Sequence, residues 1–166
     1  MNIMKKIKIE KVTLNCGTAD QTKLAKAVKL LETISGEKVI KTLAKKRIPE
    51  FGVRPGLPIG CKVTLRGKKA IELLKRILEG IGNKINKRQF NPDSFSFGIK
   101  EYIQIPTLSY LRDVGIMGFE VAVTLARAGY NIKKRKIKKG KISKKHQITV
   151  QETIDFAKEN LNMEIL

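Results

Sequence analysis

Cationic side chains gather in two segments of this sequence, where they could bind a polyanion. Residues 45–60, KKRIPEFGVRPGLPIG, combine three prolines and three glycines with Phe51 and the cations Lys45, Lys46, Arg47 and Arg54. Residues 133–145 hold nine lysines and arginines in thirteen positions, starting with Lys133, Lys134, Arg135 and Lys136. Lysine and arginine pair with phosphates, and an aromatic ring can stack on a base, so both segments predict contact with nucleic acid.

A third group of polar side chains follows from strand periodicity. In CKVTLR, residues 61–66, the residues Cys61, Val63 and Leu65 alternate with Lys62, Thr64 and Arg66. The first set suits a core, and the second suits either a solvated strand face or an RNA-binding face, to which a neighbouring strand adds Asn15. Paired aromatics of the RNP1 type are missing, so recognition would rest on shape, phosphates and hydrogen bonds.

The overall charge supports a polyanionic partner. The 166 residues include 35 Lys and Arg against 15 Asp and Glu, a net charge of +20. Residues 1–128 alone carry 25 basic and 11 acidic side chains, so the folded body is cationic as well as the C-terminal segment. Nucleic acid is the leading candidate, and an anionic membrane surface is the alternative. Charge on the whole body favours contact on several faces, as in a ribonucleoprotein particle.

The sequence offers few residue patterns that are typical of catalytic or metal-binding sites. The single histidine, His146, lies among lysines and is interpreted as a solvated or phosphate-facing residue, and Cys61 shares the parity of core positions. Two isolated cysteines and one histidine match no metal-ligand spacing, and no P-loop or dinucleotide fingerprint occurs. We therefore expect no enzyme activity, no cofactor and no metal site.

The N-terminal sequence MNIMKKIKIEKV lacks the apolar region of a signal peptide. No apolar run approaches the roughly 18–20 residues of a membrane span. We expect a soluble, cytoplasmic protein with reduced thiols and no membrane partner.

The elements that must position these residues alternate between strands and helices. The periodicity predicts strands over 7–15, 38–43, 61–66, 95–105 and 119–126. A change of parity predicts a bulge near Glu10, Gly98 predicts a kink, and the polar residues 82–94 predict a loop.

Three helices are predicted, within 18–36, over 68–80 and from 150 to about 161. The expected inward residues are Leu24, Ala27, Val28, Leu31 and Ile34, then Ala70, Ile71, Leu74, Ile77 and Leu78. Capping boxes are predicted at Thr18 with Gln21 and at Thr149 with Glu152, and Gly36 is the expected C-terminal stop. The result is a single α+β domain over 1–166, with a basic extension at 133–149 and one sheet face at least partly open.

Four blocks resemble one family: IEKVTLNCG, SGEKVIKTLAKKRIPEFGVRPGLPIGCKVTLRG, FSFGIKEYIQIP and GIMGFEVAVTLARAGY. Together they are similar to the universal L-five family of large-subunit ribosomal proteins over residues 7–128. PIGCKVTLRG is the most specific block. The basic segment and final helix resemble the archaeal and eukaryotic form of this family.

The resemblance implies an antiparallel sheet with helices on one face and a protein that attaches 5S rRNA to large-subunit rRNA in the central protuberance, beside neighbouring ribosomal proteins. Positions linked to 5S rRNA recognition match Asn15, Phe51 and Thr64. Glu37 stands where the family usually has Gln; its carboxylate either turns away or accepts a hydrogen bond from a base amine or 2′-OH. The expected rRNA contacts are Asn15, Glu37, Lys46, Arg47, Phe51, Lys62, Thr64, Arg66, Lys133, Lys134, Arg135 and Lys136.

The resemblance also implies that the loop between the second and third strands reaches P-site tRNA, through Gly52, Val53, Arg54, Pro55 and Gly56. Prolines that fix φ would order this projecting loop. We expect Lys46, Arg47 and Phe51 at its base and residues 54–56 at its tip. The alternatives are an RNA chaperone or assembly factor and, in another class, an RNA-modifying enzyme, which would need a cofactor pocket.

Overall fold

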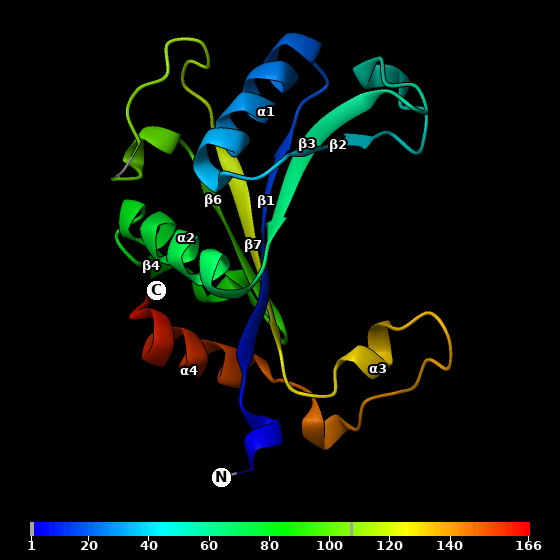
Figure 1. Cartoon of the computed structure of the whole chain (residues 1–166), viewed down its shortest axis with the longest axis vertical. Coiled ribbons are helices and arrows are strands. Elements are labelled where there is room, and N and C mark those ends of the chain that lie inside the picture. Colours follow the sequence, from blue (N-terminus) through cyan, green and yellow to red (C-terminus); the bar gives the residue numbers. More distant parts are fainter. Residues whose placement is uncertain (1, 107) are drawn as a thin grey trace.

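An antiparallel sheet of six strands forms the centre of the computed structural model, which describes residues 2–106 and 108–166 (Figure 1). In chain order its strands are β1 (Lys8–Gly17), β2 (Ile40–Leu43), β3 (Pro58–Leu65), β5 (Phe90–Asn91), β6 (Ser94–Ile99) and β7 (Phe119–Ala126). In space they follow the order β2-β3-β1-β7-β6-β5, so β1 pairs with β3 on one side and β7 on the other.

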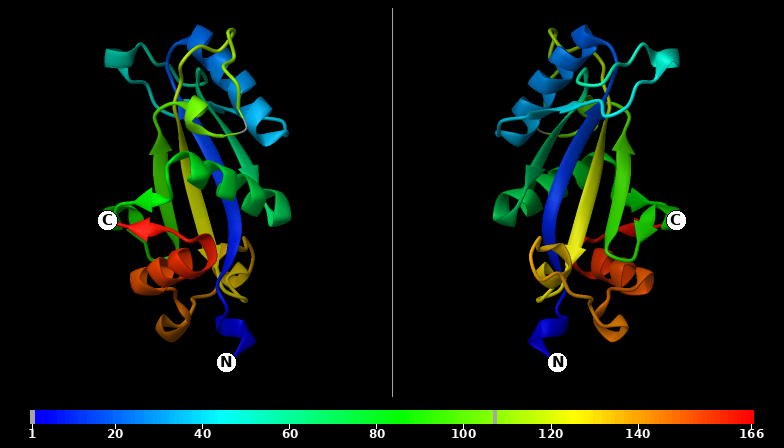
Figure 2. Two further views of the ribbon diagram at one scale, coloured as in Figure 1. Left: turned by 90° about the vertical axis from the view of Figure 1, so that its left-hand side faces the viewer. Right: turned by 90° about the vertical axis from the view of Figure 1, so that its right-hand side faces the viewer.

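Two amphipathic helices cover one face of this sheet. These two are α1 (Gln21–Ser35) and α2 (Gly67–Gly80), and the other helices are α3 (Asn131–Lys134) and α4 (Val150–Leu161). Helices α1 and α2 lie on the same side of the sheet, α4 lies at its lower end, and the opposite face of β1 and β3 is open (Figures 1 and 2). The α+β class with helices on one face is confirmed. In the described part of the chain, every helix is too short or too polar to cross a membrane.

Strand alternation builds the core between the sheet and these helices. Val12 and Leu14 of β1 and Val121 and Val123 of β7 are fully buried on the helix side. Cys61 of β3 is also fully buried, which confirms its assignment to the core. The register of β1 with β7 shifts between Ile9 and Lys11, so the bulge predicted near Glu10 is present.

The ends of α1 show one correct and one wrong prediction. Gly36 adopts φ 65°, and its N–H donates to the Glu32 carbonyl, as a C-terminal stop requires. The N-cap, however, is Asp20, whose carboxylate accepts from the Thr22 N–H at 2.9 Å. The Thr18 hydroxyl instead accepts from the Asp20 N–H, ahead of the helix. The predicted Thr18 capping box is therefore wrong, because Asp20 directly precedes the first helical residue and takes the capping position.

The buried faces of both helices are shifted slightly from the prediction. In α2, Leu73 is buried and Ile71 is 39% exposed. The buried positions of α2 follow the i, i+3, i+4, i+7, i+8 spacing from Ala70, and residue 71 lies outside that stripe. In α1, Leu30 is buried, while Val28 is only half-buried.

Residues 82–94 are more ordered than the predicted loop. They contain β4 (Lys84–Ile85), which pairs in parallel with β8 (Glu164–Ile165), and β5, which pairs with β6. Two-residue strands are too short to show a periodicity. The kink expected at Gly98 is also absent, since the β6–β7 register runs without a shift through the pair Gly98 and Glu120. The extended segment ends at Ile99.

Candidate nucleic-acid interface

Polar side chains of three strands lie in rows across the open sheet face. Lys62 of β3, Asn15 of β1 and Glu120 of β7 are register partners, and the Asn15 amide donates to the Glu120 carboxylate at 3.3 Å. In the next row, the hydroxyl oxygens of Thr13 and Thr64 are 3.5 Å apart. The structure thus brings the predicted residues Asn15, Lys62 and Thr64 together on one face, with hydrogen-bonding groups directed away from the core.

A groove of about 390 Å³ borders this face at the β3 edge, lined by residues that include Glu37, Lys62, Thr64, Arg66 and Lys69. Lys69 of α2 donates to the Glu37 carboxylate at 2.6 Å. This hydrogen bond and the lysine charge hold the pKa of Glu37 below its ordinary value. Glu37 is therefore an ionised carboxylate paired with Lys69 beside the groove. Sequence reasoning missed Lys69, because an exposed lysine in the first turn of a helix has no distinguishing pattern.

Glu10, the bulged residue of β1, joins two of the predicted basic regions. Its carboxylate accepts from Arg66, at the end of β3, at 3.4 Å and also from Lys134 of α3. Partial burial raises the pKa of Glu10, but the hydrogen bonds and charges of Lys134 and Arg66 outweigh this effect and leave the pKa lowered. The basic extension consequently lies next to the open sheet face, a proximity that the sequence did not predict.

The loop between β2 and β3 is an ordered hairpin. The Ala44 N–H donates to the Leu57 carbonyl at 2.8 Å, and Ile48 and Val53 exchange backbone hydrogen bonds at 2.9 and 3.0 Å. Between the last two residues, Pro49–Phe51 form a 3₁₀ turn that ends at Gly52, with φ 62°. Val53 is only 4% exposed, so its side chain packs inside the loop.

This hairpin contradicts the expected division of the loop into base and tip. Phe51 is 69% exposed and lies in the turn at the tip, beyond the Ile48–Val53 pair. Arg54, Pro55 and Gly56 lie on the returning arm, where the Gly56 N–H donates to Ala44 at 3.0 Å. The physical reason is that Pro49 and Gly52 supply the two conformations that a tight turn needs. Lys46 and Arg47 are exposed on the outgoing arm.

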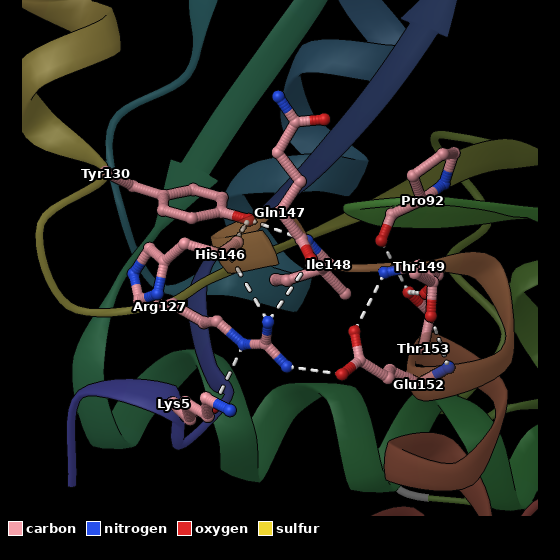
Figure 3. Close-up of polar contacts among 10 residues, drawn as sticks. All are labelled: Lys5, Pro92, Arg127, Tyr130, His146, Gln147, Ile148, Thr149, Glu152 and Thr153. Atoms are coloured by element: carbon pink, nitrogen blue, oxygen red, sulfur yellow. Dashed lines mark hydrogen bonds and ion pairs between the residues drawn. The ribbon is translucent and has the colours of Figure 1, made fainter. Parts of the chain in front are cut away.

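The basic extension is held to the body by Arg127, which follows β7 (Figure 3). The Arg127 guanidinium donates to the carbonyls of Lys5, His146 and Gln147 at 2.9, 3.3 and 3.2 Å, and to the Glu152 carboxylate at 2.6 Å. The Arg127 side chain is only 6% exposed. One buried cation thus fixes the N-terminal segment, the end of the extension and α4 relative to one another.

Tyr130 provides a second anchor beside Arg127 (Figure 3). Its hydroxyl accepts from the Ile148 N–H at 2.8 Å and donates to the His146 carbonyl at 3.3 Å. The His146 ring is half-buried, with Nε2 2.9 Å from the Ala128 carbonyl, so it has a structural contact that the expectation of a solvated or phosphate-facing residue did not include. Burial raises the pKa of Tyr130.

Sequence reasoning missed both anchors, although the sequence does mark Arg127. Val121, Val123 and Leu125 are buried at alternate positions of β7, and Arg127 continues the same parity. An arginine in register with core positions indicates a buried guanidinium that needs several acceptors. The predicted sites Lys133, Lys134, Arg135 and Lys136 follow this anchor and are exposed.

At the other end of the extension, the predicted capping box of α4 is present. Thr149 Oγ1 accepts from the Glu152 N–H at 3.3 Å, and Glu152 accepts from the Thr149 N–H at 2.9 Å. The hydrogen bond from the Thr149 backbone, together with the Arg127 hydrogen bond and charge, lowers the pKa of Glu152 despite partial burial. Both ends of the cationic segment are therefore fixed.

The two cationic segments extend from opposite ends of the sheet toward the side of its open face (Figures 1 and 2). The hairpin of residues 44–57 lies at the upper end, and residues 131–146 lie at the lower end. Between them is the polar face with Asn15, Lys62 and Thr64. This arrangement can follow a long polyanion by pairing phosphates at both ends and offering hydrogen bonds at the centre.

Comparison with known proteins identifies the family. The family model for ribosomal protein L5 matches residues 2–54, and the model for the C-terminus of the same ribosomal protein family matches residues 58–156. The chain is 46% identical over 165 residues to the large ribosomal subunit protein uL5 of Nanoarchaeum equitans, covering 98% of each chain. It is 43% identical to the uL5 protein of Sulfurisphaera tokodaii over 100% of this chain and 96% of that one, and 41% identical to that of Methanosphaera stadtmanae over 99% of both. The chain belongs to the ribosomal protein L5 family, whose members are ribosomal proteins and not enzymes.

Proposed function

We propose that this protein is a structural constituent of the large ribosomal subunit that binds 5S rRNA through its open sheet face and helps attach it to large-subunit rRNA in the central protuberance. The ribosome in the cytoplasm is its site of action. The observation that carries the proposal is the polar sheet face with a cationic segment at each end. Likeness to the uL5 proteins over nearly the whole chain supports the same role.

In this proposal the centre of the face recognises 5S rRNA. Asn15 and Thr64 offer an amide and a hydroxyl to sugar and base edges, and Lys62 and Arg66 pair with phosphates. The Glu37 carboxylate, paired with Lys69 at 2.6 Å, retains free lone pairs for a base amine or 2′-OH. A wide, shallow RNA minor groove suits this flat surface, because it displays 2′-hydroxyls and base edges.

The two cationic segments contact other RNA partners. The extension, with Lys133, Lys134, Arg135 and Lys136, pairs with phosphates of large-subunit rRNA beside the 5S rRNA site. The hairpin carries Lys46, Arg47 and Phe51 toward rRNA, and its residues 52–56 contact P-site tRNA. Its backbone pairing supports this role, because an ordered loop loses less conformational entropy on binding than a mobile one.

The test is the affinity of the purified protein for 5S rRNA as a function of salt. We expect tight binding, with log K falling linearly against log[salt] and each phosphate contact contributing roughly −0.7 to −0.9 to the slope. The control is an unrelated RNA of similar length and fold complexity. Equal affinity for the two RNAs, or a slope near zero, would contradict the proposal. Release of the protein from mature subunits at high salt would instead indicate an assembly factor.

A further inference from the structure

The basic extension and the turn at Pro92 and Asp93 border an open pocket that the proposed 5S rRNA site does not use. Its volume is about 730 Å³, within the range of small-molecule sites, roughly 300–1,000 Å³. Its lining includes Ile142, the largely buried Tyr130 and Ile148, which are 7% and 2% exposed, and Asp93 from the turn before β6. The cations around it are Lys133, Lys139, Lys141 and Lys144.

Contacts within the extension fix the walls of this pocket. The Gly140 N–H donates to the Ile132 carbonyl at 3.2 Å, which closes the loop on α3. The Gln147 amide donates to the Ile142 carbonyl at 3.3 Å, and the Tyr130 hydroxyl holds the Ile148 N–H. A Cβ at Gly140 would lie 2.8 Å from Cγ2 of Ile132, so a larger residue there would force the exposed Ile132 side chain to shift. The pocket is therefore formed before any ligand binds.

We propose that this pocket takes one unstacked nucleotide of an RNA bound along the basic extension. The base lies against Ile142 and the small exposed parts of Tyr130 and Ile148, and its phosphates lie among the surrounding lysines. The Asp93 carboxylate accepts from an amino or imino group of the base. The proposal rests on the RNA-binding function proposed above and adds a separate site to it.

The combination of groups favours a nucleotide over an acidic peptide. Apolar walls suit the face of a base, and RNA-binding proteins commonly hold splayed-out bases in this way. Asp93 would repel a peptide carboxylate at the same position, whereas it accepts hydrogen bonds from a base. The lysines contribute phosphate pairing without sequence preference, so selection in the pocket comes from the base.

Two RNA hairpins serve as the probe. One has a fully paired stem, and the other has the same stem with one additional unpaired adenosine or uridine in its middle. Fluorescence anisotropy gives the affinity of the full-length protein for each. We expect the hairpin with the unpaired nucleotide to bind at least about 10-fold more tightly, in line with the energy of stacking one base on protein side chains. The methyl NMR signals of Ile142 and Ile148 should shift with that hairpin alone.

A pocket-filling variant tests the location. Ser143→Trp places an indole at a pocket-lining position and keeps every cation. It should bind both hairpins with the affinity that the wild type shows for the paired one. Ser109→Trp is the matched control, since Ser109 is exposed in another loop, and it should retain the preference. Thermal melting checks that both variants fold.

Binding of 5S rRNA by the same preparations separates the two proposals. Intact 5S rRNA binding without any preference between the hairpins would overturn the nucleotide pocket and leave the proposed function standing. A preference that persists in Ser143→Trp would also overturn it. Failure to bind either 5S rRNA or the hairpins would overturn the proposed function itself.

Discussion

Asn15 and Thr64 direct hydrogen-bonding groups to the open sheet face, while the core lies on the other side. Thr64→Val keeps the β-branched shape and replaces only the hydroxyl with a methyl group, and Asn15→Ala removes an amide that contacts Glu120. We expect each change to weaken 5S rRNA binding by about 1–3 kcal/mol, the cost of leaving a recognition partner unsatisfied. The measurement is the dissociation constant at fixed salt, together with the melting temperature, which should be nearly unchanged.

The matched control for these changes is Thr33→Val on α1, where the hydroxyl donates to the backbone carbonyl of Lys29 within the same helix. It should leave 5S rRNA affinity at the wild-type value. If Thr64→Val or Asn15→Ala lowered the melting temperature strongly while folded protein bound 5S rRNA normally, the two residues would be structural, and the recognition role would be wrong.

Glu152 gives the stability of this protein a defined pH dependence. The carboxylate accepts from Arg127 and from the Thr149 N–H, and its pKa lies below the ordinary value of 4.5. A folded-state pKa below the unfolded one stabilises the fold above the unfolded pKa, and that contribution is lost as pH falls through the folded value. Glu152→Gln should therefore be less stable than wild type at neutral pH, and the difference should shrink in acid.

Urea unfolding at about pH 7 and about pH 3 measures this difference. Glu159→Gln is the control, because Glu159 is an exposed carboxylate on the same helix. A deficit of Glu152→Gln that stayed constant with pH would show that packing, rather than the charge on the carboxylate, is responsible. Loss of Arg127 should cost more than loss of Glu152, because the buried guanidinium also donates to the carbonyls of Lys5 and Gln147, which would be left without a donor.

The hairpin between β2 and β3 allows the proposed tRNA contact to be tested separately from 5S rRNA binding. Arg54 is exposed on the returning arm, and its backbone lies outside the Ala44–Leu57 and Ile48–Val53 pairs. Arg54→Glu reverses a charge without disturbing those hydrogen bonds. We expect ribosomes that carry it to release P-site tRNA several-fold faster and to keep their full content of 5S rRNA.

Two quantities are measured on purified ribosomes: the rate at which P-site tRNA dissociates and the amount of 5S rRNA that the ribosomes contain. Arg76→Glu, an exposed charge reversal on α2 at the helix-covered side, should change neither quantity. Loss of 5S rRNA in step with tRNA would show that this arm does not form an independent tRNA contact. An unchanged release rate would remove Arg54 from the contact altogether.

At the scale of elements, the sequence predicted the strands and helices that are long enough for their hydrophobic periodicity to be detected. Alternation placed Lys62 and Thr64 on the open face of β3, and the Thr149–Glu152 box placed the start of α4. The two-residue strands β4 and β8 escaped prediction, because their pairing joins segments about 80 residues apart through backbone hydrogen bonds that leave no pattern.

The candidate site was predictable as a set of residues but only partly as a geometry. Asn15 and Lys62 become neighbours through the strand order, which no local pattern encodes. The position of Phe51 at the loop tip depends on the Ile48–Val53 pair, and the proximity of Lys134 to Arg66 depends on Glu10 at the bulge. Each of these arrangements depends on a contact between particular residues. The types of those residues alone do not indicate that they meet.

At the scale of the whole molecule, the charge and the topology support each other. A net charge of +20 on 166 residues works against the compact state through self-repulsion. The buried residues of the sheet, α1, α2 and α4 form one continuous hydrophobic cluster, which offsets that repulsion in the free protein. Bound RNA would neutralise the exposed cations, so we expect the RNA complex to melt at a higher temperature than the free protein.

The same topology predicts that the chain unfolds as one cooperative unit. β1, from the N-terminal part, lies at the centre of the sheet between β3 and β7, and six residue pairs join β1 to β3. The N-terminal family region, residues 2–54, thus contributes a central strand to a sheet completed by residues 58–156. Neither region can bury its own strand faces without the other, so we expect a single transition.

Calorimetry tests this expectation through the ratio of calorimetric to van't Hoff enthalpy, which should be close to one for a two-state transition. Far-ultraviolet circular dichroism and the fluorescence of the buried Tyr102 and Tyr130 should follow the same curve. A fragment of residues 2–57 should remain unfolded, because its β1 would lack both neighbours. Two separate transitions, or a folded fragment, would show instead that the chain consists of two independent domains and that the single-domain interpretation is wrong.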